Sequence, residues 1–213
     1  MFNKAKKILI ISAHADDMEI GCGGTVYKLI KEGKDVYQVV LSFNLKGASK
    51  KFKEADIRRE VYESAKILGL KKENIFFEKF ENRVFPEYRQ KILDTLWKYR
   101  NKINPDVVFT MALDDMHQDH VTVAQESFRA FKDINLISYG YDWNRINKEV
   151  DFYTVLSEEE LNKKIEAVMC YKSQETGRAY FSAEYIKSWA IARGVEIKER
   201  YAETFNIIRL INR

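Results

Sequence analysis

Short, continuous apolar runs alternate along the chain with segments in which apolar residues recur at helical spacing. The runs are rich in isoleucine and valine, as in strands that are buried on both faces of a parallel sheet. They predict strands at 7–13, 36–43, 74–80, 106–111, 136–139, 150–156 and 204–210. The periodic segments predict helices at 25–31, 53–68, 86–103, 120–131, 157–169 and 183–192.

Residues that begin or end helices mark several of these boundaries. Gly69 follows one helix as a C-cap, Pro86 opens the next, and Ser157 with Glu160 makes a capping box. Strands that alternate with helices predict an α/β fold with a Rossmann-like, open and mostly parallel sheet and helices on both faces. Because no repeat or linker divides the 213 residues, we expect a single domain over 1–213.

Composition and charge remove several classes of protein. The 36 basic and 32 acidic residues are interspersed, which favours a solvated surface over a nucleic-acid groove. No stretch approaches the roughly 20 apolar residues of a membrane span. The apolar run at 8–11 is too short for a signal peptide, and two cysteines are too few for a disulfide framework. We therefore expect a cytoplasmic protein with no nucleic-acid partner and no membrane span.

All three histidines of the chain follow predicted strands. His14 stands in A-H-A-D-D just after the first strand, and His117 and His120 stand in D-D-M-H-Q-D-H just after the fourth. Ligands of open α/β sheets bind outside the carboxyl ends of the strands. A lone histidine at a strand end is most often a structural hydrogen-bonding residue. Three that lie beside aspartates at one predicted edge favour a shared site.

The residue types at this edge suit a catalytic metal, which takes three protein ligands and leaves one position for water. His14 and Asp17, three residues apart, can supply two ligands, and a histidine of the facing segment can supply the third. The pair Asp16–Asp17 can provide both a ligand and a carboxylate that takes a proton from the water. A second imidazole that does not bind the metal can stabilise the oxyanion, and His117 is available for this role.

These segments resemble the PIG-L/LmbE-like N-acetylglucosaminyl deacetylases, whose opening signature reads roughly (A/P)-H-P-D-D-x-x-x-G-x-G-G-T. This chain has A-H-A-D-D-M-E-I-G-C-G-G-T at 13–25, and H-Q-D-H at 117–120 in place of the second signature, H-P-D-H. Weaker similarities lie at 58–69, 170–174 and 201–205. The resemblance thus spans nearly the whole chain, and its first motif is the most specific.

By position, the resemblance assigns His14, Asp17 and His120 to the metal. It makes Asp16 the general base and His117 the residue that assists the oxyanion and the leaving amine. It implies a zinc-dependent hydrolase that removes the N-acetyl group of an amino sugar or amino-sugar conjugate, and oligomers from dimers to hexamers are compatible with it. Another divalent metal would suit the same ligand set.

The chain departs from the family pattern at several positions. Ala15 and Gln118 replace the prolines of the two signatures, and Tyr171 stands where the family often has a histidine. Family members contact their substrate with an arginine of the 58–69 segment. Arg58 is the nearest candidate here, although the register differs by one residue, and a solvated helix arginine explains it equally well.

Other functions compete with this interpretation. Gly21, Gly23 and Gly24 resemble a dinucleotide fingerprint, but Val26 occupies the place of its third glycine. A Rossmann-type nucleotide-binding module would bind nicotinamide or flavin and ignore chelators. A silent metal-binding protein would bind zinc and release no acetate. Within the enzyme class, the nearest rival is a metal-dependent amidase acting on a thiol-sugar conjugate or another non-acetyl amide. The aromatic residues of 139–143 are candidates for a wall that stacks on a sugar.

Overall fold

The computed structural model describes residues 4–49, 51–147, 149–174 and 177–212. A seven-stranded sheet forms the centre, with the strand order β3-β2-β1-β4-β5-β7-β6. Strands β1 to β5 are parallel, whereas β7 runs antiparallel to both β5 and β6. The strands are β1 (Lys7–Ser12), β2 (Asp35–Val40), β3 (Ile75–Phe77), β4 (Val107–Met111), β5 (Asn135–Tyr139), β6 (Phe152–Val155) and β7 (Ala202–Arg209).

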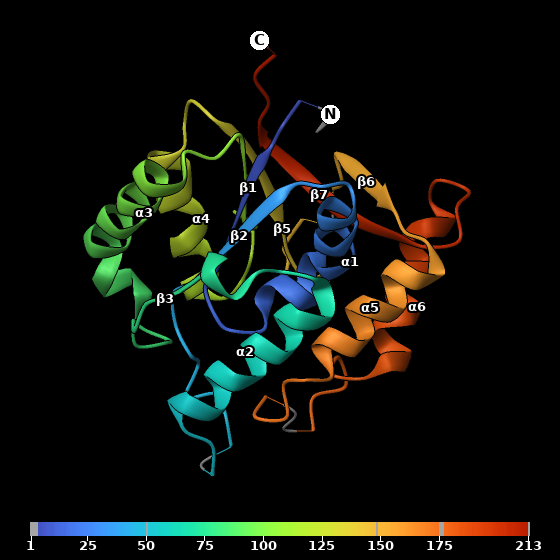
Figure 1. Cartoon of the computed structure of the whole chain (residues 1–213), viewed down its shortest axis with the longest axis horizontal. Helices are drawn as coiled ribbons and strands as arrows, with labels where there is room; N and C mark the ends of the chain where they lie inside the picture. Colours follow the sequence, from blue (N-terminus) through green and yellow to red (C-terminus); the bar gives the residue numbers. More distant parts are fainter. Residues whose placement is uncertain (1–3, 50, 148, 175–176, 213) are drawn as a thin grey trace.

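Helices cover both faces of this sheet (Figure 1). Helices α3 and α4 pack together on one face, and α1, α2, α5 and α6 form the layer on the other. Their bounds are α1 (Asp17–Lys31), α2 (Glu54–Leu68), α3 (Arg89–Ile103), α4 (Gln118–Ala130), α5 (Glu158–Val168) and α6 (Ala183–Val195). The expected fold class, a Rossmann-like and mostly parallel α/β sheet with helices on both faces, is confirmed.

The arrangement of β1 and β4 positions the functional site. Strand β1 lies between β2 and β4, and Ile8–Ile11 within it are fully buried. The chain passes from β1 outward to β2 and β3 and then returns to the other side of β1 with β4. The loops after β1 and β4 therefore diverge at this point, which is where open α/β sheets bind ligands.

Helix α1 begins earlier than the sequence predicts, at Asp17 instead of residue 25. The prediction was wrong because glycine disfavours helices, and three glycines lie in this stretch. Tertiary packing overrides that preference. A Cβ atom on Gly21 would come within 2.3 Å of the Tyr139 ring, and one on Gly24 within 2.6 Å of Leu156. The helix approaches the sheet as closely as it does because these side chains are absent.

Other boundaries shift by a few residues. Helix α4 begins at Gln118, before the predicted start at 120, and the strand predicted at 74–80 is only three residues long. Pro86 opens a separate 3₁₀ turn, Phe85–Tyr88, which precedes α3. The Gly69 cap adopts the left-handed conformation with a φ of 78°, and the capping box of Ser157 and Glu160 is present.

Within the described ranges, we find no helix that combines the length and the apolar character needed to cross a lipid bilayer.

Replacing Gly21 with alanine should lower the free energy of unfolding by about 1–3 kcal/mol, because the added methyl group collides with a buried ring. Gly23→Ala is the matched control on the same helix, since its methyl group would meet only the Lys164 side chain, at 3.3 Å. Urea denaturation of both variants measures the difference. Equal stability of the two would contradict the close packing of α1.

Candidate metal centre

Two short connections place the candidate residues in one cavity. The connection from β1 to α1 carries His14, Asp16 and Asp17, and the start of α4 carries His117 and His120. Asp16 is the N-cap of α1, with a φ of −98° and a ψ of −5°, and Asp17 is the first residue of the helix. The cavity measures about 190 Å³ and is lined by His14, Asp16, Asp17, Ile20, Asn44, Gly47, Arg83, His117, His120, Tyr141, Trp143, Asn144, Arg178 and Tyr180.

The donor atoms of His14, Asp17 and His120 form a small triangle. His14 Nδ1 lies 3.2 Å from His120 Nε2 and 3.7 Å from Asp17 Oδ2. His120 Nε2 lies 3.5 Å from Asp17 Oδ1. Ligands bound at about 2.0–2.1 Å in a tetrahedral zinc site are about 3.3–3.4 Å apart. The residues therefore fit a small divalent cation in donor type, and the two nitrogens are close to this spacing, while the Asp17 carboxylate offers a different oxygen to each histidine.

The imidazoles of His14 and His120 each contact a carboxylate through the ring nitrogen that points away from the triangle. His14 Nε2 lies 3.0 Å from Asp119 Oδ2, and His120 Nδ1 lies 2.9 Å from Asp115 Oδ2. Each contact leaves the other ring nitrogen facing the triangle. Metal-binding histidines commonly have a carboxylate on the far ring nitrogen, which fixes the ring and raises its basicity. Sequence reasoning missed these roles, although both aspartates stand in the D-D-M-H-Q-D-H segment.

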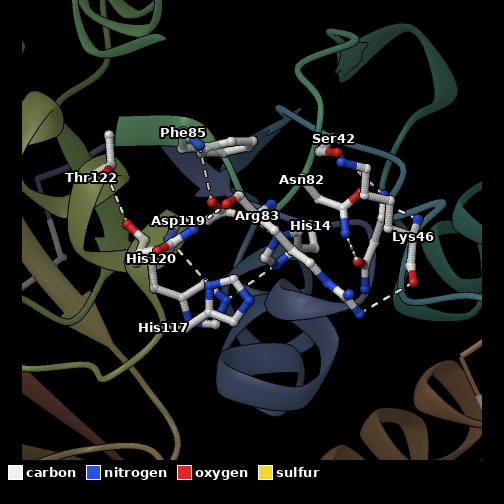
Figure 2. Close-up of polar contacts among 12 residues, drawn as sticks. His14, Ser42, Lys46, Asn82, Arg83, Phe85, His117, Asp119, His120 and Thr122 are labelled. Atoms are coloured by element: carbon white, nitrogen blue, oxygen red, sulfur yellow. Dashed lines mark hydrogen bonds and ion pairs between the residues drawn. The ribbon is translucent and has the colours of Figure 1, made fainter. Parts of the chain in front are cut away.

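Asp119 and Asp17 are fixed by further hydrogen bonds. The Asp119 carboxylate accepts from the backbone amides of Arg83, at 2.6 Å, and Phe85, at 3.2 Å (Figure 2). Asp17 Oδ2 accepts from the His14 amide at 2.7 Å, and Asp17 Oδ1 accepts from the Tyr141 hydroxyl at 2.7 Å. The carboxylates thus have fixed positions within a buried polar network.

His117 lies beside the triangle and is more exposed than the other two histidines. Its Nδ1 accepts from the Asp119 amide at 3.1 Å and caps α4, and its own amide donates to Asp115 Oδ1 at 2.7 Å. The donor nitrogens of all three histidines lie within 4.8 Å of one another, so His117 is near enough to form an alternative ligand set. The distances in the set with Asp17 are 3.2–3.7 Å, within the 4.8 Å limit that holds for the three histidines.

The site favours positive charge at its centre. Burial alone would lower the pKa of His14, but the charges of Asp17 and Asp119 outweigh it and raise this pKa to about 10. Burial would likewise raise the pKa of Asp17, yet the two neighbouring imidazoles hold it well below its usual range. The raised pKa of His14 means that its imidazole holds a second proton. A bound cation would replace that proton, because metal binding to histidine displaces protons.

The pKa values of Asp16 and His117 shift in the directions opposite to those of Asp17 and His14. Burial, together with the charge of Asp17, raises the pKa of Asp16 to about 6. Burial and the two nearby histidines lower the pKa of His117 to about 4. The site therefore places one carboxylate that readily exchanges a proton and one neutral imidazole next to the triangle.

The structure does not bring Arg58 into the cavity. Its guanidinium pairs with Glu54 at 3.1 Å and lies 4.2 Å from the ring centroid of Phe77. Tyr139 also lies outside the cavity lining, because it is buried in the core and its hydroxyl donates to the Ile11 carbonyl. Two arginines that the sequence did not single out, Arg83 and Arg178, line the cavity instead. No local motif marks them.

Comparison with known proteins places this site in a family context. A family model described as PIG-L, GlcNAc-PI de-N-acetylase, matches residues 9–131. An uncharacterized deacetylase of Escherichia coli strain K12, YaiS, is 31% identical, with 80% of this chain and 93% of that protein covered. A diacetylchitobiose deacetylase of Thermococcus kodakarensis is 30% identical, with 97% and 85% covered.

The same fold also occurs in an enzyme that is named for a different reaction. The crystal structure of GalB, the 4-carboxy-2-hydroxymuconate hydratase of Pseudomonas putida KT2440, matches with a TM-score of 0.80. The sequences are 21% identical, and the match covers 98% of this chain and 99% of that one. At this identity the likeness shows the fold alone, because one fold can carry unrelated reactions. Function must therefore be argued from the site and from the closer sequence relatives.

The carboxylates behind the imidazoles should control metal affinity. Asp119→Asn keeps one oxygen, which can accept from one of the two backbone amides, and loses the charge that supports His14. We expect its affinity for Zn²⁺ to fall about 10–100-fold, measured by competition with a chromogenic chelator. Asp94→Asn, on the exposed face of α3 where its carboxylate accepts from Gln90, is the control and should bind like the parent. Unchanged affinity of Asp119→Asn would contradict the role given to this carboxylate.

Proposed function

The chain belongs to the PIG-L family, and from this premise we propose that it hydrolyses the N-acetyl group of an amino sugar or amino-sugar conjugate with the help of a divalent cation, zinc in the first place. The observation that carries the proposal is the triangle of His14, Asp17 and His120 with a buried carboxylate next to it. This arrangement suits hydrolysis by an activated water, and the relatives named as deacetylases support an acetamide as the target.

His14, Asp17 and His120 are the proposed ligands. Their donor atoms lie 3.2–3.7 Å apart, and a carboxylate with two nitrogen ligands leaves His117 available for another role. A divalent cation at this position supplies Lewis acidity, which lowers the pKa of a water and polarises a carbonyl. Asp119 and Asp115 orient the two imidazoles, so the ligand atoms need little rearrangement.

Asp16 is the proposed general base. It lines the cavity next to Asp17 yet is not part of the triangle, so its carboxylate can accept the proton of the attacking water. Its burial favours return of that proton, because an ionised carboxylate is poorly solvated there. The same proton can then pass to the departing amine, which leaves only after it is protonated.

His117 is the proposed oxyanion partner. Since its Nδ1 accepts from the Asp119 amide, the neutral ring carries its proton on Nε2. This N–H can donate to the acetyl oxygen as negative charge develops on it. The helix N-terminus that His117 caps adds partial positive charge at the same place.

An aromatic stack supports a sugar as the substrate. Trp143 lies between Tyr141 and Tyr180, with ring centroids 4.8 Å and 4.6 Å away and interplanar angles of 8° and 16°. All three rings line the cavity. Such a wall offers apolar surface to the carbon-bound hydrogens of a sugar ring, while the polar groups opposite can hold its hydroxyls.

Asp16→Asn should retain Zn²⁺ and lose turnover by about 10²–10⁴-fold, because the water then lacks its base. His120→Ala should lose both zinc and turnover. Acetate release and metal content, measured on the same preparations, separate the two effects. Full activity in either variant would refute the assignment of that residue.

Acetate release should depend on the metal. Dialysis against a chelator should abolish release from an N-acetylated sugar, and Zn²⁺ or another divalent metal should restore it. The screen covers N-acetylglucosamine, diacetylchitobiose, nucleotide-linked N-acetyl sugars, glycosyl lipids and thiol-sugar conjugates. Release of a different acid from a non-acetyl amide would favour the alternative hypothesis of a metal-dependent amidase. Tight binding of nicotinamide or flavin, with no hydrolysis, would favour the nucleotide-binding module.

A further inference from the structure

The side of the cavity formed by Arg83 and Arg178 carries positive charge that the proposed hydrolysis does not use. Arg83 follows β3, and Arg178 precedes α6. In the part of the chain that the structure describes, neither guanidinium pairs with a carboxylate. The neighbouring Lys46 differs, because its amine forms an ion pair with Glu81.

Arg83 has an unfavourable backbone conformation. Its φ is 74°, in the left-handed region that normally belongs to glycine. Its amide donates to Asp119 at 2.6 Å, and its side chain crosses the cavity from there towards Lys46 (Figure 2). Glycine would make the same amide contact without strain. The conformation therefore needs a reason that lies in the arginine side chain.

The two guanidinium groups converge on one short loop. Arg83 Nη2 donates to the Lys46 carbonyl at 3.2 Å, and Arg178 Nη2 donates to the Gly47 carbonyl at 3.1 Å. These carbonyls belong to consecutive residues, so both guanidinium groups are held by the same short loop, and both residues line the same cavity. The loop is itself held by Asn44, which accepts from Asn82 at 2.7 Å.

Both arginines face the reacting region and keep donors for a ligand. A guanidinium has five N–H donors, and the carbonyl contact of each arginine uses only one of its two Nη groups. Arg178 lines the same cavity as Asp16. Among the residues that line the cavity, Arg83 and Arg178 offset the charges of Asp16 and Asp17, and a divalent cation bound there would add positive charge that favours a negatively charged substrate.

We propose that Arg83 and Arg178 form a subsite for an anionic oxygen group, a phosphate or a carboxylate, carried by the amino-sugar substrate. The inference rests on the proposed deacetylation for the identity of the sugar part. Guanidinium groups bind both kinds of oxyanion through paired N–H donors. A substrate seated with its acetamide at the metal centre would present this group to Arg83 and Arg178 in the same cavity.

The test compares matched substrates on the metal-loaded enzyme. Acetate release is measured from methyl N-acetylglucosaminide, N-acetylglucosamine 1-phosphate and 6-phosphate, and N-acetylmuramic acid. We expect kcat/KM for at least one anionic sugar to exceed that of the neutral sugar by about 10–100-fold, and the phosphate and carboxylate arms identify the group. Equal kcat/KM for neutral and anionic sugars would overturn the subsite.

Variants separate binding by the arginines from general structural effects. Arg83→Gly removes the guanidinium and relieves the left-handed strain, so its thermal stability should not fall. Arg83→Gly and Arg178→Gln should each reduce the anionic-to-neutral ratio of kcat/KM at least tenfold. The control Arg59→Gln, whose exposed side chain pairs with Asp56 on α2, should keep the parent ratio. A ratio that stays unchanged in both cavity variants would also overturn the proposal.

A binding measurement keeps the subsite testable if no sugar is deacetylated. Failure to release acetate from every substrate would reject the proposed function and leave this second readout. Calorimetry with glucosamine and glucosamine 6-phosphate should then show tighter binding of the phosphorylated sugar, and Arg83→Gly and Arg178→Gln should lose the difference. Equal binding of the two sugars would reject the subsite independently of catalysis.

Discussion

The Asp119 carboxylate joins the three segments from which the site is made. It contacts the His14 imidazole after β1, accepts from the amides of Arg83 and Phe85 after β3, and projects from the first turn of α4. A fully buried carboxylate is costly unless it is paired and hydrogen-bonded, and here the partners come from two other segments, the loop after β1 and the loop after β3. The relative positions of the loops are therefore tied to the same contacts that orient the imidazole. The Asp119 carboxylate thus fixes both the packing of these loops and the geometry of the site.

This dependence explains why the site is so compact and so charged. Four aspartates, 16, 17, 115 and 119, lie around the histidines at the switch point between β1 and β4. Repulsion among buried carboxylates must be offset by positive charge or by hydrogen bonds. The backbone amides at the N-termini of α1 and α4 supply part of this compensation, and the imidazoles supply another part. A divalent cation between His14, Asp17 and His120 would complete the balance, which agrees with the metal dependence proposed for this chain.

The sequence predicted the features of the fold that follow from hydrophobic periodicity, and the features of the site that follow from the position of residues after strands. The strands at β1 and β4 follow from apolar runs, and the gathering of the histidines follows from the rule that ligands bind at the carboxyl ends of parallel strands. The start of α1 could not be predicted in this way, because three glycines disfavour a helix there and Cys22, with a φ of −147° and a ψ of 20°, interrupts its regular geometry. Arg58 had the residue type expected of a substrate contact, yet its helix face turns it towards Phe77. The arginines of the cavity come from irregular loops, whose conformation depends on distant contacts such as that of Arg83 with Asp119.

Strain at Arg83 links the scaffold to the selectivity of the site. An L-residue in the left-handed region costs about 1–2 kcal/mol relative to the usual helical region, and glycine avoids this penalty. The turn is needed because it aims the Arg83 amide at Asp119, so the backbone conformation serves the fold. The side chain on that turn serves no contact that the fold requires beyond one carbonyl of the 44–47 loop. Arginine at this position therefore carries a backbone cost that glycine would avoid, and the guanidinium that it places in the cavity lining is the group that the proposed anionic subsite uses.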